Sequence, residues 1–421
     1  MKKHNALDLF SGCGGLSSGL EMAGFRVVAA NDIWEPAAQT FRRNHPGTRF
    51  ILGDIASESV REQIARAFAG QPCDVITGGP PCQAYSMSGA RNVDDRRGHL
   101  FEDYVELVRR LRPHVFAMEN VKGILTMEHD RPDLAPAERR EMARLKDLEK
   151  ERAALLLRRK QSKNTDKIPF AEADARRLAA VKEALARGTP ARVRLREKVT
   201  DKIVRCFKEI GYRVEFRTLN AADHGVPQKR ERVIFIGTRH GGAIEFPAPT
   251  HRPRGAGGPG HPAAGAVSWI TVRQAIDDLK DVPEDPAWSH VFARHRKDFV
   301  RRLHRTPVGA SVFGGYSDAW YRNPPDEPAR TVKENHGGVL VHYEQDRVMT
   351  PRELARLQSF PDDFRFEDSK SMVLKQIGNA VPPLLGKAIG LSLKKMLARI
   401  EKQPSGRTPR RSEARGGSRP V

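Results

Sequence analysis

The sequence is poor in cysteine and contains no long apolar run. Four of its 421 residues are cysteine, and no two of them form a CxxC pair: Cys13, Cys73, Cys82 and Cys206. This scarcity argues against a zinc cluster and a disulfide-stapled scaffold, so we predict reduced thiols and no metal. No stretch approaches the roughly 18 apolar residues that a membrane helix needs, and the first residues lack the apolar core of a signal peptide. We therefore expect a cytoplasmic protein without membrane contact.

Acidic side chains are also scarce relative to basic ones. The chain has 52 Asp and Glu residues against 73 Lys and Arg residues, which gives a formal net charge of +21. Such an excess of positive charge favours a polyanionic partner, with nucleic acid as the first candidate. A basic surface can equally serve solubility alone.

Short apolar runs alternate with helix-like stretches, the pattern of a mostly parallel α/β sheet. The strands are expected at Ala6–Phe10, Val27–Asn31, Asp74–Thr77, Val115–Met118, Arg213–Thr218 and Val233–Gly237. An amphipathic helix packed on the sheet is predicted by apolar residues at helical spacing before Gly211, namely Leu195, Val199, Ile203, Phe207 and Ile210.

Three further segments differ from this pattern. From Glu128 to Lys198 there are 20 Lys and Arg against 13 Asp and Glu, and apolar residues recur at helical spacing, which predicts a charged helical hairpin inserted into the α/β domain. That hairpin is either a solvated, silent insertion or a contact with DNA or a partner. The Pro- and Gly-rich stretch from Phe246 opens a second domain, and the basic tail from Glu401 is expected to be disordered.

A glycine-rich turn follows the first expected strand and opens a helix. Gly12, Gly14 and Gly15 would let the backbone approach a ligand closely at the helix N-terminus. Asp32 and Asp54 follow the next strand positions, where a carboxylate often binds ribose hydroxyls. A nucleotide-like cofactor is therefore predicted, the alternative being a plain tight turn with exposed acids. The spacing fits neither G-x-G-x-x-G nor a P-loop, which weakens dehydrogenase and ATPase interpretations.

One cysteine stands in an unusual context. Cys82 follows the strand Asp74–Thr77 through two glycines and two prolines, Gly78 to Pro81. Carboxyl ends of strands line the crevice of open α/β sheets, and prolines fix the backbone before the thiol. These features favour Cys82 as a nucleophile and leave the other three cysteines as small buried apolar residues.

Five blocks, in this order, resemble the DNA cytosine-5 methyltransferase family of the bacterial or phage type. They are DLFSGCGG from Asp8, GPPCQ around Cys82, MENV from Met118, QKRER from Gln228 and QIGNAVP from Gln376. Each block alone is weak, but five in the family's order are hard to obtain by chance. The resemblance implies a Rossmann-like, mostly parallel α/β domain, a smaller target-recognition domain and dependence on S-adenosylmethionine.

The resemblance also implies a division of the chain. It places the catalytic, cofactor-binding domain at 1–245 with the helical insertion at about 128–198. The target-recognition domain then covers 246–372, residues 373–400 return to the catalytic domain, and 401–421 form the tail.

Four residues are implied to carry the chemistry. Cys82 would add to carbon 6 of cytosine, after which carbon 5 takes the methyl group. Glu119 would protonate or stabilise nitrogen 3 of the ring, while Arg232 orients Glu119 and the base and Arg230 lines the pocket. Asn120 is expected to fix the turn around Cys82.

The cofactor site is implied by matching positions along the chain. Asp32 would contact the ribose and Asp54 the adenine, and the late block would fold back to close the pocket, followed by a last helix at Pro383–Leu397. The residues implied to bind S-adenosylmethionine are Phe10, Gly12, Gly14, Leu16, Asp32, Ile33, Asp54, Ile55, Pro80, Leu100, Asn379 and Val381.

A cytosine stacked in a duplex cannot reach such a pocket, so the resemblance implies base flipping. The segment Ser86–Phe101 is either a lid that closes on DNA or a long surface loop. The candidate DNA contacts are Gln83, Ser86, Arg97, Tyr316, Trp320 and Arg322. Double-stranded DNA is the expected partner of a monomer that joins the nucleoid when bound, with a cognate restriction endonuclease as a further candidate partner.

Two rival functions are also compatible with the sequence. One class of the family methylates transfer RNA, although the segment after Cys82 and the size of the second domain favour DNA. A non-catalytic DNA-binding relative would be expected to lack the nucleophile or the acid, whereas Cys82, Glu119 and Arg232 are all present.

Overall fold

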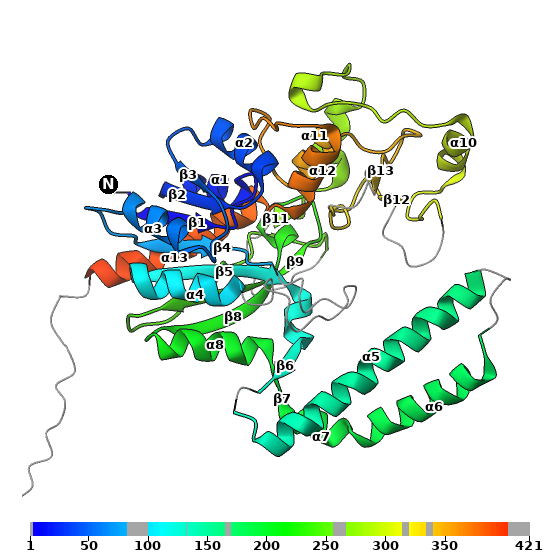
Figure 1. Cartoon of the computed structure of the whole chain (residues 1–421). Coiled ribbons are helices and arrows are strands. Elements are labelled where there is room, and N and C mark those ends of the chain that lie inside the picture. Colours follow the sequence, from blue (N-terminus) through cyan, green and yellow to red (C-terminus); the bar gives the residue numbers. More distant parts are fainter. Residues whose placement is uncertain are drawn as a thin grey trace, which may run out of the picture.

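The computed structural model describes residues 3–81, 100–131, 133–164, 170–255, 267–313, 320–333 and 340–402. Its main element is a seven-stranded sheet in the order β3-β2-β1-β4-β5-β9-β8 (Figure 1). Within it β9 runs antiparallel to both neighbours, and the other pairings are parallel. The predicted mostly parallel α/β sheet is therefore confirmed. Its strands are β1 (Asn5–Leu9), β2 (Arg26–Asp32), β3 (Arg49–Leu52), β4 (Val75–Gly78), β5 (Val115–Val121), β8 (Arg213–Asn220) and β9 (Glu231–Thr238).

Helices cover both faces of this sheet, which explains why β1 and β4 are buried along their whole length and read as apolar runs. On one face, α3 (Glu58–Ala67), α4 (Leu100–Leu111) and α8 (Val199–Glu209) enclose a core that includes Phe116 and Phe207. The other face carries α1 (Gly15–Met22) and α13 (Pro383–Lys402), while α2 (Glu35–Asn44) lies against β2 and β3. We call this three-layered unit the sheet domain.

The sequence predicted six of the seven strands to within three residues at either end. It missed β3, a four-residue strand with two exposed positions. The predicted helix over Leu195–Ile210 is split, because Leu195 ends a separate helix and α8 begins only at Val199. Gly211 follows its C-cap with a φ of 85°, the left-handed geometry expected of a helix stop.

The second domain is built from short elements around a separate apolar core (Figure 1). Its core includes Leu354, Phe360 and Ile377, and Cys13 from the glycine-rich turn packs into it. The domain boundaries drawn from the sequence stay a prediction. The elements are β10 (His251–Arg252), β11 (Val267–Ser268), α9 (Val272–Ile276), α10 (Lys297–Arg305), β12 (Tyr321–Arg322), β13 (Leu340–Val341), α11 (Pro351–Leu357) and α12 (Lys370–Asn379).

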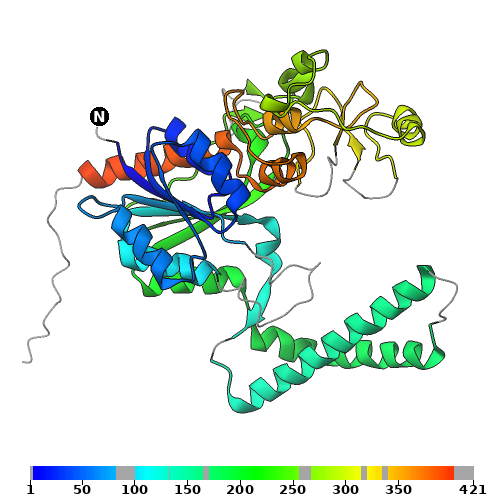
Figure 2. The same ribbon diagram turned by 45° about the horizontal axis from the view of Figure 1, so that its top comes forward.

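The charged segment forms the expected helical hairpin. It leaves the sheet domain on a two-stranded antiparallel stalk, β6 (Glu128–Asp130) and β7 (Arg196–Lys198). Between these strands lie α5 (Pro136–Asn164), α6 (Glu172–Arg187) and α7 (Thr189–Leu195), which project away from the rest of the molecule (Figure 2). We call α5 to α7 the helical arm.

The late block leads into α13, which lies on the sheet domain. Helix α13 packs along α1 because both helices present glycine at the contact. A Cβ at Gly19 would collide with the backbone of Pro383 and Lys387. Within the described residues, no helix combines the length and apolar character required to cross a bilayer. The tail at 403–421 lies outside the described residues.

Candidate active site

The reversed direction of β9 determines which side chains meet at the carboxyl edge of the sheet. Strands β1, β4 and β5 end at this edge, and β9 starts there because it is antiparallel to β5. The register pairs Val121 with Arg232 and Glu119 with Ile234. Alternate residues of a strand share one face, so Glu119 and Arg232 lie on the same face as diagonal neighbours.

Glu119 and Arg232 form an ion pair at this edge. Nε of Arg232 lies 2.8 Å from Oε1 of Glu119, and each side chain is 14% exposed. Oε2 of Glu119 faces the loop after β4, since a Cβ added at Gly79 would lie 2.9 Å from it. A glycine at position 79 therefore lets the carboxylate approach the loop that leads to Cys82.

Asn120 ties the same loop to β5. Its Nδ2 donates a 3.1 Å hydrogen bond to the carbonyl of Pro80, and the side chain is buried. This matches the expectation that Asn120 fixes the turn before the cysteine. Cys82 itself lies outside the described residues, as do the predicted DNA contacts Gln83, Ser86 and Arg97.

Arg230 lies behind the site rather than on its surface. Its guanidinium donates to the carbonyls of Val332, Gly378 and Ala380 at 2.9, 3.1 and 3.2 Å, and the residue is only 3% exposed. Burial, and the neighbouring charge of Arg232, lower its pKa to about 9. The prediction that Arg230 lines the pocket is corrected: the side chain joins the start of β9 to the second domain and to the end of α12.

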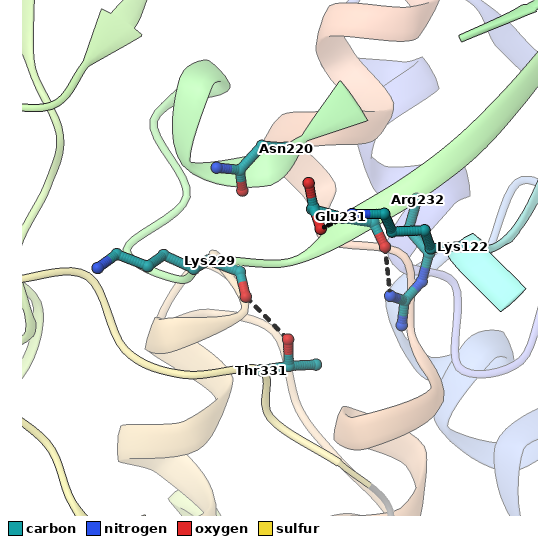
Figure 3. Close-up of a pocket in the computed structure, with 6 residues that line it drawn as sticks. All are labelled: Lys122, Asn220, Lys229, Glu231, Arg232 and Thr331. Carbon is teal, nitrogen blue, oxygen red and sulfur yellow. Dashed lines mark hydrogen bonds and ion pairs between the residues drawn. The ribbon is translucent and has the colours of Figure 1, made fainter. Parts of the chain in front are cut away.

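A cavity of about 430 Å³ opens where the sheet domain meets the second domain (Figure 3). Thr331 of the second domain closes one side by donating from Oγ1 to the carbonyl of Lys229 at 2.8 Å. Lys122 pairs with Glu231 at 2.8 Å. Lys229 and Arg232 also hold carboxylates, those of Glu327 and Glu119, each at 2.8 Å, so a phosphate at this wall would have to replace one of these ion pairs. The lining residues are Lys122, Asn220, Lys229, Glu231, Arg232 and Thr331.

Sequence reasoning found only Arg232 among these lining residues. Lys122 and Lys229 were missed because a single lysine at a strand end carries no distinctive pattern. Their role depends on the meeting of two domains, and the flanking QKRER and MENV blocks were the only available signal.

The glycine-rich turn adopts the conformation that its residues permit. Gly12 and Gly14 have φ values of 53° and 99°, and Phe10 shares this left-handed region at 53°. Asp32 holds the turn: its Oδ2 accepts a 2.8 Å hydrogen bond from the amide of Gly12, while Oδ1 accepts one from Trp34. Burial raises the pKa of Asp32. A Cβ at Gly12 would meet no atom within 4 Å, so the turn borders open space.

The structure brings part of the predicted cofactor set to this edge. Asp54 follows β3 and accepts from the amide of Ala56 at 2.9 Å, and Ile33 is 68% exposed beside Asp32. Leu16, Ile55 and Pro80 are buried, whereas Leu100 is half-buried and Asn379 exposed.

Val381 approaches the glycine-rich turn through its backbone. A Cβ at Gly15 would collide with its carbonyl oxygen, so the late block sits directly on the turn. Burial raises the pKa of the neighbouring Cys13 thiol to about 12, which fits a buried apolar residue and not a nucleophile.

The predicted contacts of the second domain are placed unequally. Trp320 is half-buried and its ring lies 5.0 Å from that of Phe299, while Tyr316 is outside the described residues. Arg322 is 4% exposed and is bound by the domain's own groups, with carbonyls at Leu303 and His342 and the carboxylate of Asp346 within 3.0 Å. The prediction that Arg322 contacts DNA is therefore corrected: its guanidinium group joins segments of the second domain by hydrogen bonds.

Comparisons with known proteins agree over most of the chain. The family model "C-5 cytosine-specific DNA methylase" matches residues 4–135 and 193–395. The Type II methyltransferase M1.HphI of Haemophilus parahaemolyticus is 32% identical over 398 residues, which cover 93% of this chain and 86% of the relative. The Type II methyltransferase M.NgoFVII of Neisseria gonorrhoeae is 31% identical and covers 90% and 84%.

Solved structures show the same fold. A structure of an E. coli protein described as a DNA modification methyltransferase encoded within a prophage superimposes with a TM-score of 0.61 at 23% identity, and covers 94% of this chain and all of that one. A Spodoptera frugiperda DNMT2 variant gives a TM-score of 0.54 at 15% identity, covering 93% of this chain and all of that one. The family match omits residues 136–192, which comprise α5, α6 and the start of α7.

Proposed function

The chain belongs to the C-5 cytosine-specific DNA methylase family, and from this premise we propose that it methylates carbon 5 of a cytosine in double-stranded DNA, with S-adenosylmethionine as methyl donor. The observation that carries the proposal is the Glu119–Arg232 pair beside the loop that leads to Cys82. The relatives are named Type II methyltransferases, which supports a role in restriction–modification. A cytoplasmic monomer accompanied by a cognate endonuclease stays a prediction.

The proposed reaction is covalent because carbon 5 of cytosine is a poor nucleophile. The Cys82 thiolate adds to carbon 6, and the electron pair of the 5,6 double bond becomes available at carbon 5. S-adenosylmethionine, when bound, would supply the methyl group that carbon 5 takes and would leave as S-adenosylhomocysteine. A base then removes the proton from carbon 5, the double bond re-forms, and the Cys82 thiolate leaves.

Glu119 would stabilise the ring while the thiolate is attached. Addition at carbon 6 drives negative charge toward nitrogen 3, where a carboxylic acid within hydrogen-bond reach can donate a proton. The geometry supports this role because Arg232 holds Oε1 and leaves Oε2 beside Gly79. Arg232 is a positioning residue for the acid, and its fork can also reach the base.

The residues at the carboxyl ends of β1, β2 and β3 fit the proposed cofactor. The space next to Gly12 leaves room for a ligand against the backbone, and exposed Ile33 offers an apolar surface for an adenine ring. Asp32 and Asp54 supply carboxylates of the kind that bind ribose hydroxyls and an amino group. The backbone of Val381 packs directly against Gly15 and would exclude water from one side of the bound cofactor.

A cytosine stacked in a duplex must be flipped out to reach this edge. The cavity beside Arg232 carries Lys122 and Lys229, whose ammonium groups pair with Glu231 and Glu327 and could exchange these carboxylates for phosphates beside the extruded nucleotide. This arrangement supports DNA as the substrate. The lid predicted at Ser86–Phe101 falls almost wholly outside the described residues and stays a prediction.

The decisive experiment is covalent trapping. Bisulfite sequencing of DNA from cells that express the chain identifies the methylated site, and a duplex with 5-fluorocytosine at that site is then mixed with enzyme and S-adenosylmethionine. Fluorine cannot leave as the proton does, so protein and DNA should stay joined through Cys82, as peptide mass spectrometry would show.

The matched control replaces another cysteine in the same way. Cys82→Ser should form no adduct, whereas Cys206→Ser, at a half-buried thiol on α8, should form it fully. Methylation of normal DNA without an adduct in the wild-type protein would overturn covalent catalysis.

A further inference from the structure

The helical arm is the part of the molecule that the family does not account for. The family match stops at residue 135 and resumes at 193, and the arm fills the interval. At 29 residues, α5 alone is about 43 Å long, which equals the rise of roughly 13 base pairs of DNA.

Ion pairs fix the base of the arm to the sheet domain. Glu149 of α5 lies 3.0 Å from a guanidinium nitrogen of Arg196 in the stalk. On the same strand, β7, Glu197 accepts hydrogen bonds from both terminal guanidinium nitrogens of Arg205 of α8, at 2.5 and 2.6 Å. Two small apolar clusters lock the helices of the arm together: Leu134, Met142 and Leu195, then Leu145, Val181 and Leu185. The helices of the arm thus pack against one another, and ion pairs attach the arm to the sheet domain.

Positive charge on the arm is distributed unevenly. Among the described residues, no ion pair or hydrogen bond engages six exposed cations of α5: Arg140, Arg144, Lys150, Arg152, Arg159 and Lys160. The arginines of α6 differ, since Arg176 and Arg187 lie within 4.0 Å of glutamates on their own helix and Arg177 pairs with Glu151. The free positive charge therefore concentrates on α5.

The orientation of the arm directs α5 toward the other domains. In Figure 1 α5 lies between α6 and the rest of the molecule, and in both views the arm projects on the same side as the second domain (Figures 1 and 2). Helix α5 thus borders the side from which DNA would reach the carboxyl edge of the sheet.

We propose that the helical arm is an additional DNA-binding element, in which the free cations of α5 contact backbone phosphates of the duplex outside the region around the target cytosine. The inference rests on the proposed function, since it takes DNA as the substrate. Lysine and arginine that hold no protein partner can bind phosphate without breaking an ion pair first. Phosphate contacts carry no sequence information, so the arm would add affinity and orientation and leave the choice of site unchanged.

The test compares two triple variants with the same loss of charge. Arg152→Gln, Arg159→Gln and Lys160→Gln together neutralise the outer part of α5, and glutamine keeps the helix propensity. Arg176→Gln, Arg177→Gln and Arg187→Gln remove three positive charges from α6, each of which lies beside a glutamate. Binding is measured against salt concentration with two duplexes that contain the methylation site, one of about 12 and one of about 40 base pairs.

The α5 variant should bind the long duplex at least about tenfold more weakly, and its log–log salt slope should fall by about 2 to 3, one unit for each lost phosphate contact. Its affinity for the short duplex, and methyl transfer to it, should match wild type, as should every value for the α6 variant. Equal losses in both variants, or an unchanged slope in the α5 variant, would overturn the arm as a DNA-binding element. Failure of the proposed function is distinct, since wild type would then methylate neither duplex.

Discussion

Arginine has opposite environments in the two halves of this molecule. Arg230, at the junction between the two domains, and Arg322 and Arg352, inside the second domain, are buried, and their guanidinium groups donate to backbone carbonyls of other chain segments. On the helical arm, Arg144 and Arg152 are exposed, and no described group pairs with them. The first set joins chain segments, whereas the second leaves its charge to the solvent or to a ligand.

This difference limits what net charge reveals. The formal charge of +21 suggests a polyanionic partner, but some of the arginines that contribute to it are buried and bind groups of the protein itself. A buried arginine contributes to the count and not to the surface field. Substitutions can separate the charges that hold the protein together from those that act in chemistry and those that are free to bind a ligand.

The largest effect is expected at the catalytic edge. Glu119→Gln introduces a neutral side chain of nearly the same shape, and it removes both the acid and the ion pair with Arg232. Turnover should fall by about 10² to 10⁴ because the ring loses its proton donor, while binding to DNA is retained. Glu215→Gln, at an exposed glutamate on β8 of the same sheet, is the control and should leave turnover unchanged. Full activity in Glu119→Gln would exclude the acid role.

Arg230→Met tests the interior arginines. The substitution leaves the carbonyls of Val332, Gly378 and Ala380 without their buried donor and should lower the free energy of unfolding by about 3 kcal/mol. Arg144→Met on the arm should change it by less than about 0.5 kcal/mol, since no described partner is lost. Denaturant titration of both variants measures the contrast, and similar losses would contradict it.

A third comparison uses two glycines of the sheet domain. Gly19→Ala places a methyl group against the backbone of Lys387 at 2.5 Å, so α1 and α13 must separate, at a cost of about 1 to 3 kcal/mol. Gly47→Ala meets no atom within 4 Å and should be neutral. Thermal unfolding distinguishes the two variants. Equal melting temperatures would show that α1 and α13 can move apart without loss of stability.

The smallest effect concerns a buried carboxyl group. Asp8 is fully buried, and burial raises its pKa from 3.8 to about 6 although Ser17 and Thr77 donate hydrogen bonds to it. The folded state therefore binds the proton more tightly than the unfolded state. The resulting stability is complete below pH 3.8 and is lost as the pH rises through about 6.

From pH 5 to pH 7 this group alone should reduce the free energy of unfolding by about 1 kcal/mol. Asp8→Asn should remove that part of the pH dependence. Denaturant titrations at the two pH values measure it, and an identical slope in the variant would show that other groups account for it.

Most of the sheet could be predicted from the sequence because buried parallel strands appear as short apolar runs. The hidden element was β3, whose four residues, RFIL, include an exposed arginine and an exposed leucine. The direction of β9 was also beyond reach, since local pattern does not fix strand orientation. That reversal is what brings Arg232 to Glu119.

The same contrast between local pattern and long-range contact applies to the site residues. Motif blocks identified Glu119, Arg232 and Asn120, and the structure brings them together around one loop. Arg322 was assigned to DNA by residue type, yet its acceptors come from Leu303, His342 and Asp346, which no local pattern connects to it. Sequence indicates which residues are unusual, while burial depends on contacts between distant segments.

The contact between the end of α12 and the glycine-rich turn has a consequence for synthesis on the ribosome. Cys13 in the glycine-rich turn meets Gln376 across 363 positions, so the turn stays uncovered until almost the entire chain has been made. A nascent or truncated product lacks the segment that covers this turn. Such a product should therefore be inert, and modification of the genome should begin only with finished copies of the enzyme.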